Sequence, residues 1–85
     1  MNTFKVHILS AHRTFYEGEC ESIIIPAVDG QYGVLAGHCN TVRAIVPGKL
    51  IFRAPGQEAQ EVAVSAGIMK VEDNDVLILA DSVLR

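Results

Sequence analysis

Residues 19–37 read ECESIIIPAVDGQYGVLAG and combine the main local signals for β-structure in this chain. This stretch joins a β-branched run to Pro26 and then to three closely spaced glycines. β-Branched residues favour strands, proline has no N–H for a strand ladder, and glycine permits the positive φ of tight bends. We therefore predict a strand over residues 19–25 that ends at Pro26, followed by short strand pieces joined by tight bends over residues 28–37.

The rest of the chain repeats short alternations of apolar and polar residues, interrupted by Gly, Pro, Asn or Asp. Interruptions at intervals of about 8–12 residues are typical of an all-β sandwich or barrel. Further strands are expected over residues 4–8, 13–16, 41–46, 49–54, 61–65, 68–72 and 76–80, with a break at Glu17-Gly18. Residues 81–85 carry a possible helix N-cap but are too few for a stable helix. A chain of 85 residues is expected to form one domain over 1–85.

The composition argues against several classes of protein. The formal charge is −3, and the seven Lys and Arg residues are scattered singly, so no nucleic-acid binding is expected. No run approaches the roughly 18 apolar residues of a membrane helix, and the N-terminus lacks the pattern of a signal or transit peptide. We therefore expect no direct membrane insertion. Cys20 and Cys39 form no Cys-x-x-Cys pair and are expected to be free thiols.

The residues that often carry chemistry do not form a recognisable active site. The glycines fit neither the dinucleotide-binding spacing nor the phosphate-loop spacing, and Leu50 stands where a magnesium-binding Ser or Thr would follow Gly48-Lys49. His38 and Cys39 are adjacent, so on a strand they point to opposite faces and make a poor metal pair. We expect no catalytic residue, no metal and no cofactor. The residues alone therefore predict a binding or structural module.

The two faces of the strand expected over residues 19–25 are both partly apolar, so either could face the core. The alternation places Cys20, Ser22 and Ile24 on one side, and if these face the core, Ile23 and Ile25 point outward. Outward isoleucines would form a docking surface, since contiguous exposed apolar patches often mark partners. The alternative is that neighbouring loops partly cover both faces.

Residues 24–38, IIPAVDGQYGVLAGH, resemble the signature of the epsilon subunits of F-type ATP synthases. That family typically shows a hydrophobic strand, a proline or small residue, and then GELGILPGH. Agreement continues in order and spacing over nearly the whole chain, at residues 9–11, 15–19, 46–52, 64–71 and 76–81. Each motif alone is weak, but their shared register is specific.

The resemblance implies a flattened sandwich of two sheets with about ten short strands. It also implies a non-catalytic central-stalk subunit that docks on the gamma subunit and on the membrane rotor ring, and so couples ion-driven rotation to ATP synthesis. The isolated chain would be a monomer and, in the complex, peripheral at the cytoplasmic face of a bacterial membrane. By position, Asp29, Gly30, Gln31 and His38 are expected to contact the ring, whereas Ile23 and Ile25 are expected to contact gamma.

The chain departs from the family pattern at several positions. Gln31 stands where glutamate is common, which removes one charge from the expected ring contact, and Ala36 replaces the proline before Gly37-His38. Family members usually continue into two regulatory helices, so the 85-residue chain is expected to couple rotation without inhibiting hydrolysis, whether it is naturally short or trimmed. The alternative to a rotor subunit is a stand-alone sandwich that binds a small ligand or a protein, although the absence of Trp disfavours an aromatic binding platform.

Overall fold

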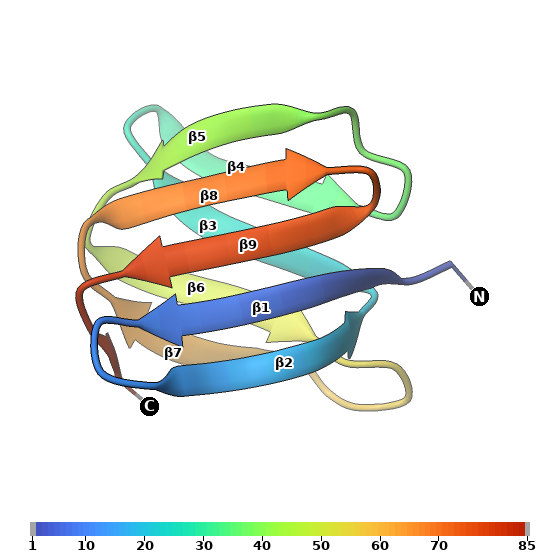
Figure 1. The fold of residues 1–85 in the computed structure, drawn as a ribbon, viewed down its shortest axis with the longest axis horizontal. Helices are drawn as coiled ribbons and strands as arrows, with labels where there is room; N and C mark the ends of the chain where they lie inside the picture. Colours follow the sequence, from blue (N-terminus) through green and yellow to red (C-terminus); the bar gives the residue numbers. More distant parts are fainter. Residues whose placement is uncertain (1, 85) are drawn as a thin grey trace.

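The computed structural model describes residues 2–84, which form two five-stranded β-sheets that face each other (Figure 1). The strands of sheet A are β1 (Phe4–Ser10), β2 (Thr14–Cys20), β5 (Thr41–Ile45), β8 (Gly67–Glu72) and β9 (Asp75–Ala80). Those of sheet B are β3 (Ser22–Ala27), β4 (Gly30–Leu35), β6 (Gly48–Arg53), β7 (Gln60–Val64) and β10 (Val83–Leu84). The prediction of a two-sheet sandwich with about ten short strands is confirmed.

The two sheets have simple strand orders. Sheet A runs β2-β1-β9-β8-β5 and is the nearer layer in Figure 1, while sheet B runs β10-β7-β6-β3-β4 behind it. Neighbouring strands pair antiparallel throughout, except β1 and β9, which are parallel. Strands β5 and β4 are therefore the edge strands of the two sheets on the same side of the sandwich (Figure 1).

The core lies between the sheets and follows from the period-two alternation. In β1, for example, Phe4, Val6 and Ile8 are buried whereas Lys5 is exposed. Within residues 2–84 every buried residue is apolar. The fully buried larger side chains are Val6, Ile8, Ile23, Ile25, Val34, Leu50, Phe52, Val62, Met69, Val71, Val76 and Ile78.

The strand break near Glu17 lies elsewhere than predicted. Strand β2 runs without interruption through Gly18, which pairs with Val6 of β1. A Cβ at Gly18 would lie only 3.0 Å from the Tyr16 hydroxyl oxygen, so glycine here serves close side-chain packing rather than a turn. The chain instead leaves sheet A at Glu21, whose N–H donates to the Arg53 carbonyl at 2.7 Å, and enters sheet B as β3.

This crossing corrects the expected orientation of Ile23 and Ile25. Because Glu21 lies between two strands, the inward-outward alternation shifts by one residue there, so Cys20 and Ile23 both point into the core. Ile23 and Ile25 are each 0% exposed, and Ile24 is the isoleucine of β3 that faces outward. The expectation that Ile23 and Ile25 form an outward docking surface is therefore wrong.

Three further elements differ from the expectation. Strand β3 does not end at Pro26, because its pairing with β6 stops at Ile24 and the missing N–H of proline interrupts no ladder on that side. Residues 30–35 form one strand rather than several pieces. Val83–Leu84 forms β10 on β7, not the start of a helix, and Arg85 lies outside the described residues.

Candidate functional site

The outer face of sheet A changes character from one end to the other. Cross-strand partners point to the same face, so each rung of the sheet can be followed from strand to strand. One rung, the apolar rung, is apolar from β1 to β5 and ends at Thr14 on β2, and a second rung mixes apolar and polar residues. The apolar residues of the first rung are Leu9, Leu79, Ile68 and Ala44, and the mixed rung consists of Glu17, His7, Leu77, Lys70 and Val42.

The apolar rung lies at the end of sheet A where β9 leaves for sheet B. Ile68 and Leu79 are 44% and 45% exposed and pair with each other across β8 and β9. They border a hollow that is also lined by Ala11, Ala66 and Asp81. We name Leu9, Ala44, Ile68 and Leu79 the apolar row. Large exposed side chains that touch one another in this way are typical of a surface that docks another protein.

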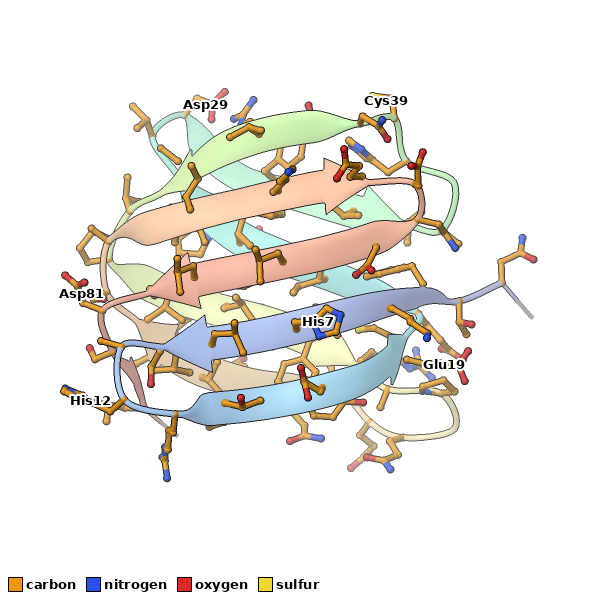
Figure 2. All side chains as sticks on the ribbon, viewed as in Figure 1. His7, His12, Glu19, Asp29, Cys39 and Asp81 are labelled. Atoms are coloured by element: carbon orange, nitrogen blue, oxygen red, sulfur yellow. The ribbon has the colours of Figure 1, made fainter. Side chains whose placement is uncertain are left out.

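The opposite end of the same face is charged. His7 lies between two carboxylates, with Nδ1 at 2.8 Å from Glu17 Oε2 and Nε2 at 3.3 Å from Asp75 Oδ1. Figure 2 shows the His7 imidazole on the outer face of β1, pointing away from the core. Lys70 and Glu72 form a further pair at 3.5 Å. The carboxylates and Lys70 therefore make this end of the face polar, in contrast to the apolar row.

The outer face of sheet B offers no comparable row. Its central rung contains Ile24 and Ile51, but Gly33 and Glu61 flank them. The next rung contains exposed Leu35, beside Ser22 and Arg53. Polar residues or glycine therefore interrupt each of these rungs.

A second feature is a cluster of four side chains along the edge where β4 and β5 lie. Arg43 places its guanidinium carbon 4.2 Å from the centre of the Tyr32 ring, and its Nη2 lies 3.0 Å from Asp29 Oδ1. Tyr32 hydrogen-bonds His38 Nε2 at 2.9 Å, with the two rings nearly edge to face. We name Asp29, Tyr32, His38 and Arg43 the edge cluster.

The hydrogen bonds of His38 define its tautomer. Its Nδ1 lies 2.7 Å from the Cys39 carbonyl oxygen, which can only accept, so Nδ1 carries the proton. In the neutral ring Nε2 then accepts from the Tyr32 hydroxyl. This arrangement fixes the loop after β4 against the strand itself.

The structure brings together only some of the residues expected at the ring contact. Asp29 and His38 belong to the edge cluster, while exposed Gln31 pairs with Pro26 on the outer side of sheet B. Gly30 adopts a φ of 117°, which residues with a side chain rarely adopt, and so allows the tight turn before β4.

Sequence reasoning missed Tyr32 and Arg43. Tyr32 points to the same face of β4 as buried Val34, and Arg43 points to the same face of β5 as buried Ile45, so both point inward from an edge strand. A cationic residue in phase with the core of an expected strand was the available signal for Arg43.

The two cysteines have opposite environments. Cys39 is exposed, whereas Cys20 is buried with Sγ at 3.0 Å from the Ser22 carbonyl oxygen and 3.2 Å from that of Arg53. Burial, assisted by the charge of Glu21, raises the pKa of the Cys20 thiol. Both are free thiols, as expected. Buried and hydrogen-bonded, Cys20 is a packing residue rather than a nucleophile.

Within the described part of the chain, no three His, Cys, Asp or Glu side chains form a group that could hold a metal ion. Among residues 2–84 there is also no helix long and apolar enough to span a membrane.

Together, these features define a small β-sandwich domain with an exposed apolar row on one face and a polar edge cluster. Comparison with known families is specific: residues 3–85 match the beta-sandwich domain of the ATP synthase delta/epsilon chain. The chain belongs to this family.

Individual relatives agree with this assignment. The ATP synthase epsilon chain of Laribacter hongkongensis is 40% identical over 86 residues, which cover all of this chain and 61% of the relative. That of Caldicellulosiruptor saccharolyticus is 37% identical over 83 residues, covering 98% of this chain and 60% of the relative. The chain thus spans about three fifths of the length of these relatives.

The fold also has solved counterparts. A chain in the cryo-EM structure of the Euglena gracilis mitochondrial ATP synthase (OSCP/F1/c-ring, rotational state 1) superimposes with a TM-score of 0.92 at 24% identity. The match covers 99% of this chain and 54% of the other. At this level of identity the likeness establishes the shared fold.

Proposed function

We propose that this chain is a non-catalytic subunit of the central stalk of an F-type ATP synthase. In this role it docks on the gamma subunit and on the membrane rotor ring, and transmits ion-driven rotation toward the subunits that make ATP. The observation that carries the proposal is the family match over residues 3–85, in relatives named ATP synthase epsilon chain. The corresponding location is peripheral, at the cytoplasmic face of a bacterial membrane.

The contact with gamma is assigned to the apolar row of sheet A. Ile23 and Ile25 are buried and cannot be reached by a partner. In contrast, Ile68 and Leu79 are exposed and adjacent, and the charged end of the same face supplies a polar rim. Apolar centres with polar rims are the usual anatomy of a stable interface.

The contact with the ring is assigned to the β3–β4 turn and the edge cluster. Asp29 and His38 project along one edge of the sandwich, and the rigid turn at Gly30 and Gln31 lies beside them. Arg43 of the edge cluster points inward from β5, whereas its neighbour Ala44 in the apolar row points outward, so the two proposed contacts use different faces of this strand.

The proposal is tested by reconstitution. ATP synthase depleted of its epsilon subunit is combined with this chain, and ATP-driven proton pumping is measured in membrane vesicles. We expect pumping to be restored, because the rigid sandwich links gamma to the ring. If the chain binds the depleted complex but pumping does not recover, the coupling role is wrong.

A further inference from the structure

The edge cluster connects the edge strand of sheet A to the edge strand of sheet B through side chains. Sheet A ends at β5 and sheet B ends at β4, and these two edge strands belong to different sheets. Tyr32 and Arg43 point inward from them, and the guanidinium lies over the aromatic ring at 4.2 Å from its centre. A cation held against an aromatic face is attracted by the negative charge of the π system, so this contact links the two sheets.

The outer ends of the two side chains each hold a different segment. The guanidinium of Arg43 pairs with Asp29 in the β3–β4 turn, whereas the hydroxyl of Tyr32 donates to His38 in the loop that leads to β5. Arg43 therefore connects the turn to β5, and Tyr32 connects the loop to β4. The β3–β4 turn and the loop at His38, which are separate in sequence, are thus both attached to the stacked side chains of Arg43 and Tyr32.

We propose that Arg43 and Tyr32 are positioning residues that fix the β3–β4 turn and the loop at His38 in one arrangement for docking on the rotor ring. This inference rests on the proposed function. It also gives Asp29 a different role from an acidic contact: its carboxylate is paired within the chain, and Gln31 beside it is neutral.

A purely stabilising role for the cluster makes a different prediction. If the Arg43–Tyr32 contact only stabilises the core, removing it would lower the midpoint of thermal unfolding. The position of the β3–β4 turn in the assembled complex would stay the same. A positioning contact changes where the turn docks even in a variant that remains folded. The two roles are therefore separated by measuring crosslinking and stability on the same variants.

The experiment uses cysteine crosslinking in the assembled ATP synthase that contains this chain. A cysteine at Gln31 is crosslinked to single cysteines placed along the polar loop of the ring subunit. Cys39→Ser removes the exposed thiol, and buried Cys20 is left in place. Arg43→Met keeps the apolar stem of the side chain but removes its charge and its N–H donors. Lys49→Met is the matched control, because Lys49 also pairs with a carboxylate, Glu61, at 3.5 Å but on the outer face of sheet B.

We expect Arg43→Met to lower the crosslinking yield at the preferred ring position by about fivefold, as befits losing one cation–π contact and one exposed ion pair. Lys49→Met should leave the yield unchanged. In the isolated chain, NMR order parameters of the Asp29 and Gly30 amides should fall toward about 0.6, the flexible range, only in the Arg43 variant. If Arg43→Met does not fold, Arg43→Lys replaces it, since lysine keeps the charge but loses the flat group over Tyr32.

The outcomes separate the two proposals. An unchanged crosslinking pattern in a folded Arg43 variant, with normal crosslinking in the parent chain, overturns the positioning role and leaves the rotor function intact. Absence of any crosslink from Gln31 in the parent chain overturns the ring-facing surface itself, and the positioning role with it. A loss of crosslinking in Arg43 variants that remain folded, with the Lys49 control unaffected, supports the proposal.

Discussion

At the scale of single residues, Ile23 and Ile24 are sequence neighbours with opposite environments. Ile23 is 0% exposed in the core, whereas Ile24 lies on the outer face of sheet B. Their orientation depends on Glu21, the one residue between β2 and β3, since it shifts the alternation. The sequence predicted the strands from their β-branched residues and turn signals, but it did not predict the shift of the inward-outward alternation at Glu21. The shift depends on where the chain crosses between sheets, and that is fixed by the backbone bond from Glu21 to Arg53.

The corrected orientation is tested by a pair of truncations. Ile23→Ala removes buried methyl groups and leaves a cavity, so we expect it to lower the free energy of unfolding by about 2–5 kcal/mol. Ile24→Ala should cost less than about 1 kcal/mol, because that side chain is already partly in water. Urea unfolding followed by circular dichroism measures both. Equal losses in the two variants would contradict the assigned faces.

A second prediction at this scale concerns Cys20 and pH. Burial raises the pKa of the Cys20 thiol above its value in the unfolded chain. The folded state then holds the proton more tightly, so the resulting stability is fully present below the unfolded pKa. It is lost as the pH rises through the folded pKa, at a rate of up to about 1.4 kcal/mol per pH unit.

The measurement is urea unfolding between pH 8 and pH 10 for the parent chain, Cys20→Ala and Cys39→Ala. We expect a flatter decline with pH in Cys20→Ala, and a decline like that of the parent in Cys39→Ala because Cys39 is exposed. Identical slopes in all three proteins would mean that Cys20 does not contribute to the alkaline loss of stability.

At the scale of elements, residues that favour turns, such as Gly, Pro, Asn and Asp, predicted most of the strand boundaries. Asp73 and Asn74 both adopt positive φ, at 51° and 63°, and form a two-residue turn between β8 and β9, so Asp75 already belongs to β9 rather than to the turn before the strand expected over residues 76–80. Gly18 and Pro26 were misread as breaks because their local effects depend on neighbours outside the strand. The Tyr16 ring covers Gly18, and the β6 ladder stops before it reaches Pro26.

Two strand glycines should respond differently to the same substitution. A Cβ at Gly67 would collide with the Leu79 carbonyl oxygen and lie 2.8 Å from Ala80 Cα, both backbone atoms of the paired strand. We expect Gly67→Ala to destabilise by about 1–3 kcal/mol or more, since this backbone must shift. A Cβ at Gly33 would meet only Ile24 Cγ1 at 4.0 Å, so Gly33→Ala should be neutral or slightly stabilising. Thermal unfolding compares the two, and a Gly67→Ala protein as stable as the parent would refute the tight β8–β9 contact.

At the scale of the whole molecule, the sequence was sufficient to predict the family and the β-sandwich, but it did not predict the apolar row that we propose as the docking face. The apolar row brings Leu9, Ala44, Ile68 and Leu79 together from four strands, three of which are far apart in the chain. The edge cluster likewise depends on two edge strands that meet only in the folded domain. Alternation within one strand identifies its two faces, but it does not say which residues of other strands will lie beside them.

The most direct test of the proposed docking is calorimetric titration of the isolated chain with the gamma subunit of an F-type ATP synthase. Leu79→Asp places a charge in the apolar row, and Leu84→Asp places one at a similarly exposed leucine at the edge of sheet B. We predict that the parent and Leu84→Asp bind gamma alike, and that Leu79→Asp loses about 2 kcal/mol or more of binding free energy, as expected for a buried interface anchor. Equal affinity of the parent and Leu79→Asp for gamma would contradict docking through the outer face of sheet A.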